Sequence, residues 1–131
     1  MKWSEELATG IEKVDEHHRM IFQMAEDFRS ALDEGGGASV YETMLRSLEL
    51  YVRSHFRYEE RCMERLRCPA ARQNREAHAS FVETLAGFRR RYESAGFDPA
   101  EARRLVDTVD DWLASHICGV DIHLRECVRR S

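Results

Sequence analysis

The amino-acid sequence predicts an all-α protein, an antiparallel up-down-up-down four-helix bundle with an N-terminal arm and a short C-terminal helix. Apolar residues recur at helical spacing in four long segments, and short stretches rich in helix-breaking residues separate these segments. Only two prolines occur in 131 residues, which suits long helices. Long helices joined by short connections pack as antiparallel neighbours in a bundle.

The first predicted helix ends before Gly35, Gly36 and Gly37, because consecutive glycines break a helix. Its apolar residues recur with the period of one helix face. This stripe consists of Val14, His18, Ile21, Phe22, Ala25, Phe28 and Leu32.

The second predicted helix has the longest apolar stripe. Ser39 followed by Glu42 resembles a capping box, which would place the start of the helix at that serine. Pro69 either ends this helix or opens the next one. The stripe consists of Tyr41, Leu45, Leu48, Val52, His55, Phe56, Glu59, Met63 and Leu66.

The third predicted helix stops at residues 94–96, which are Ser-Ala-Gly. Asp98 and Pro99 then restart the chain as N-cap and first helical residue, with Glu101 supporting the cap. The third stripe consists of Asn74, His78, Phe81, Val82, Leu85, Phe88 and Tyr92. The fourth consists of Ala102, Leu105, Val106, Val109, Leu113, His116 and Ile117, and the amphipathic tail after Gly119 carries Ile122, Leu124 and Val128.

Length and composition limit the class of protein. We expect residues 1–131 to form a single domain, since this length provides one core. The net charge of −4 does not favour nucleic acid, and the basic residues at 89–91 and near Arg129 lie among acidic helix faces. Residues 1–6 show no apolar core of signal-peptide length, so we expect no signal peptide, and no run of apolar residues is long enough to span a bilayer. We therefore expect a cytoplasmic monomer with neither nucleic acid nor membrane as partner.

The four cysteines, at 62, 68, 118 and 127, form neither a CxxC pair nor zinc-finger spacing. In a cytoplasmic protein this pattern predicts reduced thiols rather than disulfides or a structural zinc site. We expect them to act as small apolar packing residues.

One histidine lies on each apolar stripe: His18, His55, His78 and His116. A single histidine in such a position is usually a hydrogen-bonded core residue. Four of them directed toward one bundle centre indicate a buried metal site instead. A bundle without metal, in which these side chains satisfy one another, is the structural alternative.

Two carboxylates complete the predicted ligand set. Glu59 lies four residues after His55, so both side chains share one helix face. An ionised carboxylate on an apolar face is costly to bury unless a cation or hydrogen bonds compensate it. Asp121 lies five residues after His116, which does not fit a straight helix, so we expect Gly119 to permit a bend that directs Asp121 inward.

Two carboxylates with four imidazoles favour two metal ions over one, because carboxylates bridge metals and each imidazole usually serves one. Ligand type alone permits iron, manganese or zinc. A dizinc hydrolase is therefore an alternative, although the chain shows no phosphate-binding loop.

Four separated motifs resemble the hemerythrin family, in particular its bacterial single-domain members. They cover nearly the whole chain and occur with the same order and spacing, and Trp3 precedes the first helix as it does there. The resemblance implies a four-helix bundle with a non-haem diiron site that binds dioxygen reversibly. The motifs are residues 10–18, residues 55–60 with Met63, residues 69–78 with Phe81, and residues 112–117 with Asp121.

The resemblance also assigns the ligands. His18 and His55 would hold one iron ion, and His78 and His116 the other. Glu59, Asp121 and an oxo or hydroxo group would bridge the two ions.

The sequence departs from the family at one ligand position. The family has a further histidine four residues before the one matched by His78, and this chain has Asn74 there. Three readings of Asn74 remain open: its oxygen binds iron weakly, water fills the position, or the helix shifts so that Asn74 leaves the site. Neither His17, His123 nor Glu76 is placed to replace the missing imidazole.

With Asn74 absent from the ligand set, both iron ions would keep an open position. The leading function is then dioxygen binding for storage, delivery or sensing, without a catalytic residue and with an unknown redox partner. The alternative is an enzyme with peroxidase, oxidase or nitric-oxide-related activity at the more open site. A neutral amide that merely lowers metal affinity is the simpler reading.

Neighbouring residues on the same stripes predict an apolar oxygen pocket. Leu113 and Ile117 flank His116 and should lie nearest the ligand, and these residues are also ordinary core positions. Trp112 and Tyr58 are candidate hydrogen-bond donors near the metal. The predicted wall consists of Phe22, Phe56, Leu113 and Ile117, with Ile21 and Phe81 beside them.

Overall fold

A computed structural model describes residues 3–119 and 121–130, except for the side chains at 118, 119, 121, 122 and 130. All the regular elements in this part of the chain are helical, which confirms the all-α prediction. The four long helices are α1 (Glu12–Asp33), α2 (Ala38–Arg65), α3 (Ala71–Ala95) and α4 (Pro99–Gly119). A 3₁₀ turn, η1 (Glu5–Leu7), precedes them, and α5 (Asp121–Arg130) follows.

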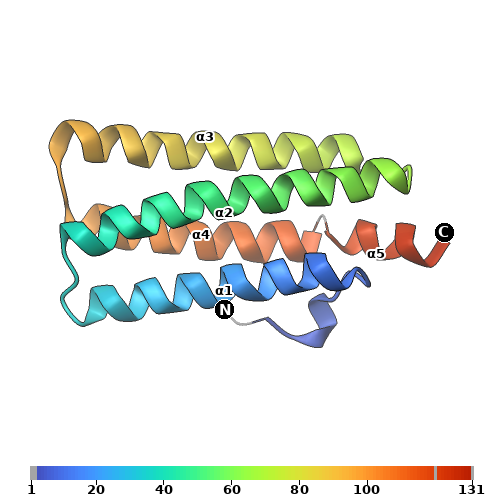
Figure 1. The fold of residues 1–131 in the computed structure, drawn as a ribbon, viewed down its shortest axis with the longest axis horizontal. Coiled ribbons are helices and arrows are strands. Elements are labelled where there is room, and N and C mark those ends of the chain that lie inside the picture. The colour runs from blue at the N-terminus through green and yellow to red at the C-terminus, as the bar shows by residue number, and fades with distance from the viewer. Residues whose placement is uncertain (1–2, 120, 131) are drawn as a thin grey trace.

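The long helices form an antiparallel bundle (Figure 1). The α1–α2 and α3–α4 connections lie at one end, and the α2–α3 connection lies at the other. Helix α1 contacts α2 and α4, and α3 contacts the same two helices, so the four close into a ring. Each helix therefore presents one face to a common interior, as the four apolar stripes predicted. No helix in the described part of the chain has the length and apolar character needed to cross a bilayer.

The predicted capping box at Ser39 is wrong. Helix α2 begins at Ala38, and the Tyr41 amide donates to the Gly37 carbonyl at 3.1 Å. Ser39 thus already lies in the first turn, where its carbonyl accepts the Thr43 hydroxyl at 3.0 Å. The glycine run permits this earlier start because no side chain restricts the turn.

The α2–α3 connection contains Pro69, which belongs to neither helix. Helix α2 ends in a Schellman motif, in which the Cys68 amide donates to the Met63 carbonyl at 2.9 Å. Arg67 takes the left-handed conformation of this motif, with φ of 51°. The chain is already turning before the proline, so Pro69 is not the cause of the helix end.

Helix α4 begins at Pro99 as predicted, and the Ala100 amide donates to Asp98 Oδ1 at 3.0 Å. The expected support from Glu101 is wrong, because its carboxylate accepts hydrogen bonds from Arg91 and Arg104 instead. It therefore ties α4 to α3.

A second, smaller cluster of buried residues lies beside the main core and involves α5. Leu124 and Cys127 of α5 pack there with Val14 of α1 and Met63 of α2. The Arg125 guanidinium donates to the carbonyls of Ala8, at 2.8 Å, and Glu6. Helix α5 thereby holds the N-terminal arm against this end of the bundle.

Cys68 and Cys127 form a disulfide, which corrects the expectation of reduced thiols. The bond joins the α2–α3 connection to α5 across 59 residues of chain. Sequence spacing did not indicate it because the two residues meet only through the tertiary fold. Cys62 is a buried free thiol, as expected, and the side chain of Cys118 lies outside the described residues.

We predict that reduction will destabilise the protein, because the bond restricts a long loop in the unfolded chain. The expected loss is about 2–4 kcal/mol, or on the order of 10 °C in Tm. Calorimetry with and without reductant measures this change, and peptide mapping identifies the linked peptides. The same reductant should leave the Tm of Cys127→Ser unchanged, and an equal fall in that variant would contradict the assignment.

Candidate metal centre

Five of the predicted ligands meet at the bundle centre. His18 comes from α1, His55 and Glu59 from α2, His78 from α3 and His116 from α4, and all five side chains are buried. Each helix supplies an imidazole because each places its histidine on the stripe that faces the interior. The described side chains therefore form the cluster that the four stripes predicted.

The carboxylate of Glu59 lies between two pairs of histidines. Its Oε2 is 3.1 Å from Nε2 of His18 and 3.1 Å from Nε2 of His55. Its Oε1 is 3.4 Å from Nε2 of His78 and 3.5 Å from Nε2 of His116. Two ligand groups that share Glu59 result, and each could hold a metal ion.

The electrostatics of the cluster favour cations. Burial opposes ionisation of Glu59, but hydrogen bonds from the four imidazoles outweigh it and hold its pKa well below the usual value. Burial lowers the pKa of His55 to about 4, against the attraction of Glu59, and it also lowers the pKa of His116. At neutral pH the centre thus combines an ionised carboxylate with at least two neutral imidazoles, which is a donor set for metal ions.

Sequence reasoning missed two residues behind the imidazoles. Nδ1 of His78 is 2.9 Å from Oε2 of Glu60, and Nδ1 of His55 is 3.2 Å from Nδ1 of His17. Metal-binding histidines typically make such a hydrogen bond through the nitrogen that does not bind metal. His17 thus contacts His55, a candidate ligand on α2.

Asn74 is fully buried, one turn before His78 in the continuous helix α3. Neither its side-chain nitrogen nor its side-chain oxygen has a hydrogen-bond partner within the described part of the chain. An unsatisfied buried amide costs roughly 1–3 kcal/mol. The amide of Asn74 therefore lacks polar partners among the described residues, and a metal ion or water near the centre would supply them. Glu76 is exposed, as predicted.

The side chain of Asp121 lies outside the described part of the chain, as do residue 120 and the side chain at 122. The predicted bend and the inward turn of Asp121 therefore stay predictions.

Aromatic rings enclose the cluster. Phe56 stacks on His78 with ring centroids 3.8 Å apart, and Trp112 stacks on His116 at 4.2 Å. Trp112 therefore contacts His116 through the face of its ring. Tyr58 lies edge-on to His17 at 5.6 Å, outside the cluster. The predicted wall residues are all buried in the main core: Phe22, Phe56, Leu113 and Ile117, with Ile21 and Phe81.

A hollow of about 420 Å³ lies between α2 and α3 and reaches the edge of the centre. Phe56 and His78 are among the residues that line it, together with Arg53, Arg75 and Val82. This hollow is the side from which a small molecule would approach His78.

These features define a class: a four-helix bundle whose interior carboxylate is shared by histidines from all four helices, as in proteins that bind metal cations. Residues 9–124 match the family described as “Hemerythrin HHE cation binding domain”, and the chain belongs to this family.

Several relatives match along most of the chain. A bacteriohemerythrin from Stenotrophomonas maltophilia is 31% identical and covers 91% of this chain and 75% of its own length. One from Pseudomonas aeruginosa is 30% identical, with 98% and 82% covered, and a myohemerythrin from Theromyzon tessulatum is 28% identical, with 92% and 87% covered. A crystal structure of a leucine-to-phenylalanine mutant superposes with a TM-score of 0.83 at 24% identity, covering 98% of this chain and 96% of that one, which supports the fold.

We predict that the metal-free protein will lose stability in mild acid. The pKa of His55 falls from 6.5 to about 4 on folding, so protonation between these values favours the unfolded chain. The cost reaches about 3 kcal/mol below that window. Glu59 has a lowered pKa and adds stability that is lost as pH falls below 4.5.

Urea unfolding of chelator-treated protein between pH 7 and pH 4 tests this prediction. His55→Gln should reduce the dependence of the unfolding free energy on pH between about 6.5 and 4. The matched substitution His123→Gln, at an exposed position, should not. Parallel curves for His55→Gln and the parent protein would refute the assignment.

Proposed function

We propose that this protein is a non-haem diiron dioxygen-binding protein, formed as one hemerythrin domain by residues 1–131. Membership in the hemerythrin family supports a non-haem diiron oxygen-binding protein in general. The observation that carries the proposal is the position of Glu59, which directs one oxygen at each of two histidine pairs. A carboxylate placed in this way suits a bridge between two metal ions.

The residues fit two iron ions. His18 and His55 would hold one ion, and His78 and His116 the other, with Glu59, Asp121 and an oxo or hydroxo group as bridges. The buried carboxylate requires positive charge, and the imidazole nitrogens that face it are 3.1–3.5 Å from its oxygens. When bound, the ferrous pair would supply the electrons for reversible dioxygen binding.

The other residues of the site would orient the ligands and exclude water. Glu60 and His17 hold the outer nitrogens of His78 and His55, which fixes the orientation of both rings. The apolar wall around Leu113 and Ile117 keeps solvent protons from the interior. These roles suit storage, delivery or sensing of oxygen rather than transformation of a substrate.

An enzyme is the second candidate, favoured by two observations on the α3 side. Asn74 offers no imidazole where the family has one, and the hollow between α2 and α3 reaches His78. A more open second iron position with an adjacent opening would admit peroxide, nitric oxide or an external reductant.

Metal analysis combined with oxygen titration tests the proposed function. We predict about two iron ions per chain, with Glu59→Ala losing most of both because each ion would lose a ligand. His123→Ala, at an exposed position, is the control. The reduced protein should gain a visible absorption band in air that vanishes under vacuum.

One iron ion per fully loaded chain would contradict the two-ion proposal. Steady consumption of peroxide with an electron donor, without a reversible band, would support the enzyme instead.

A second prediction concerns Asn74→His. A histidine four residues before His78 lies on the same face of α3, so it should supply an imidazole to the second iron ion. Iron loss to a chelator should slow by on the order of tenfold. Oxidation in air should also slow, and any peroxidase activity should fall.

Asn74→Leu is the matched control, because it fills a similar volume without a donor atom. Its iron retention should be no better than that of the parent. If Asn74→His and Asn74→Leu behave alike, residue 74 does not face the metal, and the open-position interpretation fails.

A further inference from the structure

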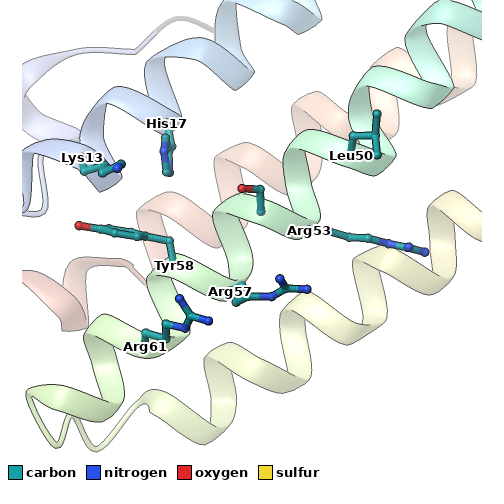
Figure 2. Close-up of a pocket in the computed structure, with 8 residues that line it drawn as sticks. Lys13, His17, Leu50, Arg53, Arg57, Tyr58 and Arg61 are labelled. Atoms are coloured by element: carbon teal, nitrogen blue, oxygen red, sulfur yellow. The ribbon is translucent and has the colours of Figure 1, made fainter.

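A basic pocket of about 410 Å³ lies on the outer face of α1 and α2, and we refer to it as the α1–α2 pocket. Figure 2 shows Lys13 and His17 from α1 opposite Tyr58 from α2, with Arg57 and Arg61 beside Tyr58. Arg53 also lines the pocket, but its side chain extends from α2 away from Lys13 and His17, and it lines the hollow between α2 and α3 as well. Four permanently charged residues, Lys13, Arg53, Arg57 and Arg61, are therefore among those that line this pocket.

Among the described residues, the arginines of this pocket lack the close acidic partners that most other arginines have. No carboxylate is among the residues that line the α1–α2 pocket. Within the described part of the chain, no ion pair involves Arg53, Arg57 or Arg61. Most other arginines do have acidic partners; Arg89, for example, pairs with Glu42 and Glu49.

The spacing makes the contrast stronger. Arg53, Arg57 and Arg61 follow one another at intervals of four residues, so they lie on one face of α2. Like charges at this interval repel one another and destabilise a helix. The chain as a whole is acidic, with a net charge of −4, and yet it gathers these cations in a lining that contains no carboxylate. A bound anion would relieve the repulsion.

The chemistry of the lining indicates the class of anion. Guanidinium groups match phosphate oxygens with paired donors, and Lys13 adds a point charge that lies over the Tyr58 ring, 5.4 Å from its centroid. The volume suits a small molecule rather than a flat protein surface. We propose that the α1–α2 pocket binds a small phosphate-type oxyanion, either free or as part of an ester.

The pocket also adjoins the metal centre through one residue. His17 lines the pocket, and its Nδ1 is 3.2 Å from Nδ1 of His55. A bound anion would therefore contact the side chain that orients a predicted iron ligand. The binding proposal itself does not depend on iron, because the cations that carry it lie on the outside of the bundle.

Calorimetric titration with inorganic pyrophosphate tests the proposal, using iron-loaded and metal-free protein at constant ionic strength. We expect one site per chain in both forms. Arg57→Gln with Arg61→Gln should weaken binding at least about tenfold, because two phosphate contacts are lost. Arg90→Gln with Arg103→Gln removes the same charge from exposed positions elsewhere and should change affinity less than about twofold.

Further readouts separate specific binding from general charge attraction. Pyrophosphate should shift the ring proton signals of His17 in NMR spectra, and circular dichroism should show that both double variants are folded. Tighter binding of adenosine diphosphate than of pyrophosphate would identify an ester as the ligand, and the reverse a free oxyanion. Absence of saturable binding, equal loss in both double variants, or binding of polyglutamate alone would overturn the proposal.

Discussion

The buried carboxylate of Glu59 is the constraint on which the rest of the bundle depends. It is ionised inside an apolar core, where a charge is tolerated only with close partners. Four imidazoles from four helices approach its two oxygens, so every helix must reach the same depth with its histidine turned inward. The rotation and axial position of each long helix are therefore set at one point.

The elements around this centre hold it at that depth. The main core packs the long helices against one another along the bundle. At the end of the bundle with the α2–α3 connection, α5 covers a small core. The disulfide joins α5 to that connection, and Arg125 binds the N-terminal arm. These contacts secure the end of the bundle at which α5 begins. The first residue of α5 is Asp121, the predicted sixth ligand. A stable C-terminal helix would thus support the second bridging position.

The four helices and the five clustered candidate ligands were predictable because helical periodicity is a local signal and each candidate lies on an apolar stripe. Residues that act across helices were not. Glu60 follows Glu59 directly, yet its contact with His78 depends on how α2 and α3 pack, and the same holds for His17 and His55. Cys68 and Cys127 are far apart in sequence, and only the position of α5 brings them together. The error at Ser39 was local: the helix N-cap is Gly37, two residues earlier than the side-chain chemistry of Ser39 and Glu42 indicated.

Two polar features of this protein lack partners from the described part of the chain: the buried amide of Asn74 inside the bundle, and the arginines of the α1–α2 pocket on its outer face. Inside, an amide is buried without a hydrogen-bond partner among the described residues, which costs stability unless something absent from the chain itself approaches it. Outside, three arginines lie at four-residue intervals on one helix face and make no ion pair among the described residues, and like charges at this spacing cost stability. Protein surfaces and cores normally avoid both costs, because partners are easily supplied by substitution. Both features lie close to candidate ligands, Asn74 to His78 and the pocket to His55, and bound molecules in place of side-chain partners would explain both. On this view α2 would separate a metal site from an anion site, and His17, which lines the pocket and contacts His55, would link the two.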